Sequence, residues 1–313
     1  MNKYLLLLLI LLVFTSLFIG VKDISLSDIL KMSEDEVLVF TISRIPRTIA
    51  LVLVGAGISI AGFIMQQISQ NKFVSPTTAG TLDAAKMGIL FSLLWMPQQS
   101  MISKMLFALL FTFMTSLLFI FMVRKIRFKS LVFIPLIGIM LGNILTAIST
   151  FFAYKNNIIQ NVQGWLMGDF SSILQGQYET LYFILPAVII TYLYANQFTL
   201  VGMGENFSKT LGLPYQSIVT LGLFCVSLTV SVTVITVGAI PFLGLIVPNI
   251  VSMFRGDNLK KTLPTTALFG AVFLLFCDIA GRLIIYPYEI PIGLMVGVIG
   301  GIIFLYLILK KNK

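Results

Sequence analysis

The chain has no histidine, only two cysteines, and few charged residues, which make up 11% of its 313 residues. The lack of histidine excludes a histidine-ligated metal centre. Cys225 and Cys277 both lie in long apolar runs, so we expect them to pack as small apolar side chains and not to form a disulfide. Hydrophobic residues make up 58% of the chain, and the mean hydropathy is +1.01. A soluble domain of this length could not bury so much apolar surface, so the composition predicts an all-α polytopic membrane protein.

Nucleotide-binding and catalytic motifs are missing as well. The nearest approach to a phosphate-binding loop, GENFSKT at Gly204–Thr210, lacks the required Gly-Lys-Ser/Thr ending. Paired catalytic carboxylates and a nucleophile–base motif, which an intramembrane enzyme would need, are also missing. The net charge of +9 comes from basic residues in short loops, which is a signal of membrane topology and not of nucleic-acid binding. We expect no enzyme activity, no metal or other cofactor and no nucleic-acid partner, so energy for transport must come from a partner or an ion gradient.

Ten stretches of the chain reach or approach the ~20 apolar residues that one membrane crossing needs. Ser217–Phe254 is about twice that length, so we expect it to cross twice, divided at Gly238–Pro241. With this division, basic loops follow every even span, which places both termini in the cytoplasm by the positive-inside rule. We expect one transmembrane domain over residues 1–313 in the cell membrane, with spans at Tyr4–Gly20, Thr48–Met65, Pro76–Met96, Met105–Val123, Leu131–Tyr154, Thr180–Tyr194, two in Ser217–Phe254, Pro264–Tyr286 and Pro291–Leu309.

The apolar stretch that starts at Gly238 is interrupted where a membrane helix is normally regular. Pro241 and Pro248 each remove a backbone donor, and glycines flank them. In hydrocarbon, carbonyls freed in this way must be covered by protein or by a water-filled cavity. The sequence therefore predicts either a kinked span or a segment that lines a transport path, followed by a basic cytoplasmic turn at Arg255–Lys261.

Charged residues within the spans occur mainly as two local pairs. Asp83 and Lys86 are three residues apart, and Asp278 and Arg282 are four apart, so each pair shares one helix face. A charge at the membrane centre costs ~3 kcal/mol on insertion scales, so these groups must face protein or water. We expect both to be structural ion pairs, with a contact to a transport path as the alternative for Asp83 and Lys86.

The fifth span carries a polar stripe. Asn143, Thr146 and Thr150 lie on one face of this helix amid apolar residues. Such a stripe serves either helix–helix hydrogen bonds or the wall of a transport path.

Motifs along nearly the whole chain resemble a known family. They are RIPR at Arg44–Arg47, the spacing of Gly55, Gly62 and Gln66, WLMGD at Trp165–Asp169, LVGMGENFSKTLGL at Leu200–Leu213, GAIPFLGLIVPNI…GDNLKKTLPTTALFGAVFLLFCDIAGR at Gly238–Arg282, and EIPIGLMVGVIGGIIFLYLI at Glu289–Ile308. In this order they resemble the FecCD-type permeases, the membrane subunits of ABC importers for iron–siderophore complexes, haem and cobalamin. The NKFVSPTTAG variant, which starts at Asn71, is similar to the catecholate and petrobactin-type ferric-siderophore branch.

The resemblance implies a fold and a set of partners. It implies the type II ABC importer permease fold, with about ten transmembrane helices per subunit. The implied partners are a second permease subunit, identical or paralogous, a cytoplasmic ABC ATPase dimer, and an extracellular substrate-binding lipoprotein. The implied substrate is a ferric siderophore.

The resemblance also implies roles for particular residues. The loop between spans six and seven would form coupling helices that contact the ATPase, and arginines at the outer face would dock the binding protein. Span five, span ten and the interrupted segment would line the path. The implied residues are Gly204, Glu205, Leu211 and Gly212 for coupling, Arg44, Arg47 and Arg282 for docking, and Asn143, Thr146, Thr150, Pro241 and Pro248 for the path.

Some positions depart from the family pattern, and other functions remain open. Asn249 and Ser252 stand where the family usually has histidine and arginine, so no role is carried over to them. An ion-gradient-driven secondary transporter would also have broken helices, although it would usually carry more carboxylates within its spans. The same ABC permease role for haem or cobalamin is a further alternative.

Overall fold

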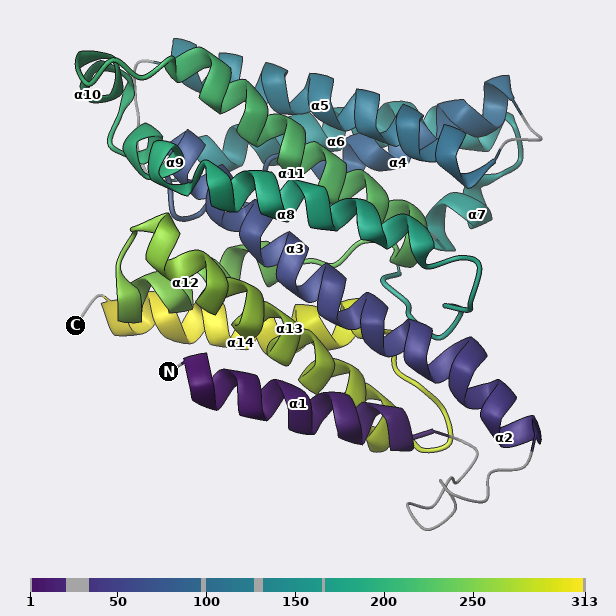
Figure 1. The fold of residues 1–313 in the computed structure, drawn as a ribbon. Helices are drawn as coiled ribbons and strands as arrows, with labels where there is room; N and C mark the ends of the chain where they lie inside the picture. Colours follow the sequence, from purple (N-terminus) through teal and green to yellow (C-terminus); the bar gives the residue numbers. More distant parts are fainter. Residues whose placement is uncertain (1, 21–33, 97–99, 127–131, 165–166, 312–313) are drawn as a thin grey trace.

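The computed structural model describes residues 2–20, 34–96, 100–126, 132–164 and 167–311. Trp165 of the WLMGD motif lies outside these ranges. Within them, every regular element is helical (Figure 1). The elements are α1 (Asn2–Phe18), α2 (Glu34–Val39), a π-helical turn (Phe40–Arg44), α3 (Ile45–Ser69), α4 (Thr81–Trp95), α5 (Met101–Lys125), α6 (Phe133–Lys155), α7 (Ile159–Gly164), a 3₁₀ helix (Glu179–Phe183), α8 (Ile184–Leu193), α9 (Ala195–Gly202), α10 (Glu205–Thr210), α11 (Tyr215–Val237), α12 (Leu243–Arg255), α13 (Leu259–Ile284) and α14 (Ile292–Lys311).

Each of the ten expected spans corresponds to a helical segment, and the all-α membrane fold is confirmed. Among the described residues, five helices are long and apolar enough to cross a membrane. The segment Glu179–Gly202 is bent by 67° between α8 and α9, and it makes a sixth if both parts are counted as one span. Helices α1, α4 and α12 have 17, 15 and 13 residues, fewer than the ~20 that one crossing needs. Helix α14 has 20 residues, which is about the length of one crossing.

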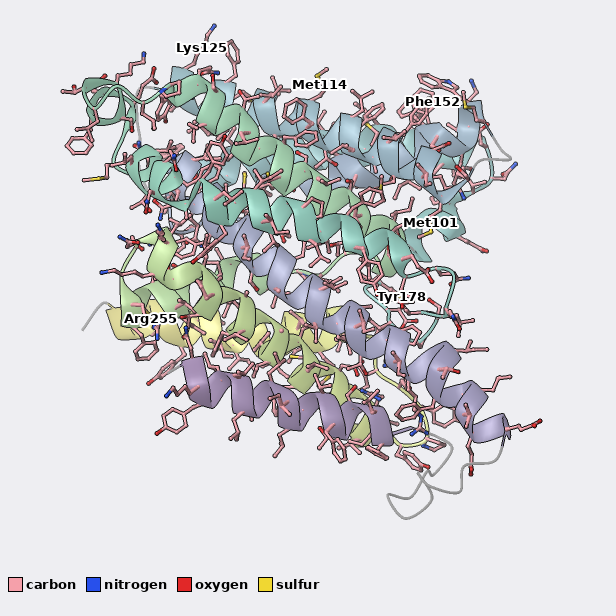
Figure 2. The ribbon with its side chains drawn as sticks, viewed as in Figure 1. Met101, Met114, Lys125, Phe152, Tyr178 and Arg255 are labelled. Carbon is pink, nitrogen blue, oxygen red and sulfur yellow. The ribbon has the colours of Figure 1, made fainter. Side chains whose placement is uncertain are left out.

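Both termini lie at the same end of the bundle, as expected for an even number of crossings (Figure 1). Lys125 and Arg255 lie at that end too, whereas Met101, Phe152 and Tyr178 lie at the opposite end (Figure 2). That this end faces the cytoplasm stays a prediction from the basic loops.

Two predicted helix starts were wrong. Helix α4 begins at Thr81, because the preceding residues 76–80 form turns in which Thr81 Oγ1 donates to the Pro76 carbonyl. Helix α13 begins at Leu259 and not at Pro264, because the Asn258 side chain caps it by accepting from the Lys261 amide. Lys261 therefore lies in the first turn of α13, and the basic turn after α12 is shorter than expected.

Helix α3 lies diagonally across the middle of the bundle and packs against α11, α12 and α13 (Figure 1). Two of its glycines allow backbones to meet. A Cβ at Gly55 would lie 2.7 Å from the carbonyl oxygen of Gly270 in α13, and one at Gly62 would lie 1.8 Å from that of Gly244 in α12. Gln66, one turn further on, donates to the Leu245 carbonyl at 3.5 Å. Gly55, Gly62 and Gln66 are therefore spaced so that all three lie on the face of α3 that packs against neighbouring helices.

We predict that Gly62→Ala destabilises the folded permease. The added methyl group would meet the backbone of α12, which cannot rotate away, and overpacking of this kind costs ~1–3 kcal/mol. Gly301→Ala in α14 is the matched control, since a Cβ there meets no atom within 4 Å. Retention of monodisperse protein after heating in detergent measures the effect, and equal thermal stability of the two variants would contradict the packing argument.

Candidate functional site

The interruption in the long apolar stretch lies where the sequence predicted it. Helix α11 ends at Val237, and Gly238 and Phe242 both have positive φ, of 82° and 60°. Helix α12 starts only at Leu243 and has 13 residues, so it is ~20 Å long, less than the ~30 Å of the hydrocarbon core. Helix α12 is too short to cross the membrane alone. The irregular segment Gly238–Phe242 must therefore supply the rest of the crossing that follows α11.

Protein, not open space, covers the carbonyl that Pro248 frees. Pro248 lies inside α12 and has no amide to donate to the carbonyl four residues earlier, that of Gly244. Gly62 of α3 packs directly on this carbonyl. Pro248 itself is buried within the protomer, whereas Pro241 is half-buried. In this conformation, part of the Pro241 side chain is accessible and could line a transport path, whereas Pro248 is buried and could contribute very little exposed surface.

The WLMGD loop reaches the interruption from the other side. The Asp169 amide donates to the Val237 carbonyl at 2.9 Å, and the Gly293 amide at the start of α14 donates to the Gly168 carbonyl at 2.9 Å. A Cβ at Gly168 would lie 2.5 Å from the Ala239 carbonyl oxygen. The backbones of the WLMGD loop, the irregular segment Gly238–Phe242 and the start of α14 are thus in direct contact with one another.

The polar stripe of α6 lies on an exposed face of the protomer and meets the charged pair of α4. Asn143, Thr146 and Thr150 are all exposed. Thr146 Oγ1 donates to Asp83 Oδ1 at 3.1 Å, and Lys86 Nζ lies 3.0 Å from the same oxygen. The predicted ion pair therefore forms, and it lies beside the stripe.

At the end opposite the termini, Asp278 holds two arginines. Its Oδ1 accepts from Arg47 Nη2 at 2.7 Å, and its Oδ2 accepts from Arg282, so the predicted pair in α13 forms. Arg47 Nη1 also lies 2.8 Å from Glu289 Oε2. Arg282 Nη2 donates in addition to Ser16 Oγ at 2.7 Å, which ties α13 to α1.

The three arginines singled out from the sequence lie around one cavity of about 250 Å³. Arg44 donates to the carbonyls of Leu17 and Phe18 at the end of α1, at 2.8 and 3.1 Å. Arg44 and Arg282 are 7% and 6% exposed, and the Arg47 side chain is 13% exposed. These guanidinium groups already have internal partners, and Arg47 has the most surface of the three.

The loop between α8 and α11 forms two short helices, α9 and α10. Gly204 and Gly212 bound α10 with positive φ, of 111° and 76°. Leu211 is 56% exposed, and Glu205 pairs with Lys209 at 2.7 Å. Gly204 and Glu205 also line a cavity of about 600 Å³. All four residues predicted for coupling therefore lie together in one short, protruding segment (Figure 1).

Hydrogen bonds that the sequence did not reveal connect this segment to the long helices. The Leu259 amide at the start of α13 donates to Thr199 Oγ1 of α9 at 3.0 Å. Gln70 Nε2, just after α3, donates to the Val201 carbonyl at 3.5 Å. Asn249, one of the departures from the family pattern, donates to the Lys72 carbonyl at 2.8 Å, and Ser252 donates to the Asn249 carbonyl. Thr199 and Gln70 lie outside the motifs, and the partner of Asn249 could not be predicted, because each of these contacts joins segments distant in sequence.

Comparisons with known proteins agree with this architecture. Residues 8–310 match the model of the FecCD transport family. The chain is 56% identical to the petrobactin import system permease protein YclN of Bacillus subtilis, over 99% of this chain and 98% of that protein. It is 47% identical to the ferric-anguibactin transport system permease protein FatD of Vibrio anguillarum, over 96% and 95%. An inward-facing structure of a metal-chelate type ABC transporter superposes with a TM-score of 0.82, at 28% identity over 99% and 98% of the two chains. This chain belongs to the FecCD transport family.

Proposed function

We propose that this chain is the membrane-spanning permease subunit of an ATP-driven importer that carries ferric siderophores, of the catecholate or petrobactin type, into the cytoplasm. The observation that carries the proposal is the 56% identity to a petrobactin import permease over essentially the whole length of both chains. The relative that is 47% identical has the name of a ferric-anguibactin permease, so both belong to siderophore systems. The chain is a transport subunit, and ATP is hydrolysed by a separate ATPase.

The proposed orientation places the end that holds both termini in the cytoplasm. Basic residues at this end, such as Lys125 and Arg255, support that orientation through the positive-inside rule (Figure 2). The segment α9–α10 would then contact the cytoplasmic ATPase dimer through Gly204, Glu205, Leu211 and Gly212. The opposite end would receive the extracellular binding protein.

A second permease subunit would cover the α6 face and enclose the path. Asn143, Thr146 and Thr150 are exposed in the protomer, and polar groups are disfavoured against hydrocarbon. An identical or paralogous partner would leave these residues, together with Pro241, on the wall of a central path. Pro248 would act there indirectly, by freeing the Gly244 carbonyl on which Gly62 of α3 packs.

Reconstitution of the whole importer tests the function. The permease pair, the ATPase and the binding protein are placed in liposomes, and uptake of radioactive ferric siderophore is measured with ATP inside. We expect uptake to require ATP hydrolysis and to survive ionophores that collapse ion gradients. Uptake that stops with the gradient and continues with an inactive ATPase would favour a secondary transporter, and uptake of haem or cobalamin alone would favour those substrates.

We predict that Gly212→Leu uncouples ATP hydrolysis from uptake. Gly212 has φ of 76° and no atom within 4 Å of a built Cβ, so a side chain strains the turn without a clash. Gly176→Leu is the matched control, because Gly176 also has positive φ and open space but lies in the loop before the 3₁₀ helix. Backbone strain of this kind costs ~1–2 kcal/mol at either site, so only the position of the turn distinguishes the two variants. Equal uptake per ATP by the two variants would count against coupling through this turn.

Docking of the binding protein is proposed to use the cavity formed by Arg44, Arg47 and Arg282. Carboxylates on the binding protein would compete with Glu289 for Arg47, the most accessible of the three guanidinium groups. Reversing the charge of Arg44 or Arg47 would also break internal contacts, so a loss of docking in those variants would be ambiguous.

Removal of the competing carboxylate is the sharper prediction. Glu289→Gln should tighten docking about two- to fivefold at low salt, the range expected for a partly exposed ion pair, and should make docking more salt-sensitive. Glu179→Gln is the control: it removes the same charge from an exposed residue of the 3₁₀ helix, whose carboxylate instead accepts from the Gly176 amide. Binding of the purified partner at several salt concentrations measures both, and identical affinities would remove Arg47 from the docking surface.

A further inference from the structure

The ion pair of Asp83 and Lys86 lies far from the membrane surface along α4. Helix α4 ends at Trp95, which is 66% exposed and of a residue type enriched at the membrane surface. At ~1.5 Å per residue, Lys86 and Asp83 lie about 14 and 18 Å along the helix from Trp95. Half of a ~30 Å hydrocarbon core is about 15 Å, so the pair lies close to the membrane centre.

The pair is not enclosed by the protomer. The Asp83 side chain is 24% exposed and the Lys86 side chain is 15% exposed. By contrast, Asp278 is 1% exposed, and Arg282 is 6% exposed. Charged groups with surface at the membrane centre must meet protein or water, because contact with lipid tails is unfavourable. The pair therefore belongs to a face that lipid does not cover.

Helix α6 forms one side of this face. Gly142 makes room for the carboxylate, since a Cβ there would lie 2.6 Å from Asp83 Oδ2. Thr146 donates to Asp83, and the exposed Asn143 and Thr150 extend the polar surface along α6. The carboxylate thus has fixed partners on two helices. The Lys86 ammonium, a group with three donors, has one ion-pair partner among the described residues.

We propose that Lys86 is a substrate-contacting cation in the transport path, held in place by Asp83 and Thr146 when the path is empty. The ligand class is an anionic ferric chelate, whose deprotonated catecholate or carboxylate oxygens accept hydrogen bonds from an ammonium group. This inference rests on the proposed function. It assigns to Lys86 a direct part in the passage of negatively charged complexes.

Accessibility of cysteines to a charged reagent tests whether the pair lies in water. The assembled importer is treated with a cationic methanethiosulfonate, and wild type supplies the background because Cys225 and Cys277 are buried. We expect Lys86→Cys and Thr150→Cys to react about tenfold or more faster than Met114→Cys, because a charged reagent is excluded from hydrocarbon. Met114 is 59% exposed and lies midway along α5, whereas the Lys86 side chain is 15% exposed, so exposure in the protomer alone would predict that Met114→Cys reacts faster than Lys86→Cys (Figure 2).

Thr150→Cys still tests the accessibility of the α6 face to water if Lys86→Cys assembles poorly. Its hydroxyl bonds only to the Thr146 carbonyl of its own helix among the described contacts, so its replacement disturbs little. Labelling of neither cysteine above the rate of Met114→Cys would overturn the inference.

Uptake tests the contact with substrate. Lys86→Gln should lower uptake of an anionic ferric catecholate about tenfold or more, as expected for the loss of a charge-assisted hydrogen bond. Lys86→Arg, which keeps the charge, should retain most of the uptake. If wild type takes up ferric siderophore and Lys86→Gln does so equally well, this inference fails and the proposed function stands. If wild type takes up none, the proposed function fails before the variants are compared.

Discussion

The hydrocarbon interior of a membrane provides no hydrogen-bond partners, so each polar group inside the bundle must be satisfied by the protein or by enclosed water. This constraint matters most at Gly238–Arg255, where an irregular segment and a proline-containing helix leave backbone groups without helical partners. Pro248 frees the Gly244 carbonyl, and the backbone of α3 covers it at Gly62. On the other side, the Asp169 amide takes the carbonyl of Val237. Two segments distant in sequence, α3 and the loop at Asp169, thus cover the backbone around the interruption between α11 and α12.

The same constraint requires that charged side chains inside the bundle have partners. Asp278 is buried and accepts from both Arg47 and Arg282, and carbonyls of α1 receive further guanidinium donors. A buried pair of this kind contributes little net stability over an apolar contact, but the removal of one partner is costly. Its effect here is to fix the relative positions of α1, α3 and α13 at one end of the bundle. Arg44, which donates to the Leu17 and Phe18 carbonyls, adds to that fixation.

Sequence reasoning predicted the features that depend on local spacing. Hydropathy placed the ten segments, and the i,i+3 and i,i+4 spacings gave both ion pairs, because residues so spaced meet on any helix. The partners of Arg47 could not be predicted, since Asp278 is 231 residues away and belongs to a different helix. The start of α13, by contrast, depends on a local signal, the Asn258 cap; Pro264 does not mark the start, because it lies in the second turn of the helix.

Helices α3 and α13 together connect the candidate sites. At one end, Arg47 of α3 bonds to Asp278 of α13 beside the arginine cavity. In the middle, Gly55 and Gly270 bring the two backbones into contact. At the other end, α9 bonds to the start of α13 through Thr199 and to the end of α3 near Gln70. Among the described contacts, the two hydrogen bonds that α9 makes at this end are neutral, and one is 3.5 Å long. Charge-assisted bonds, which are about twice as strong as neutral ones, hold the opposite end. A displacement imposed on α9 would therefore strain its own two bonds before those at the arginine cavity, and these two bonds lie at the end that the ATPase is proposed to contact.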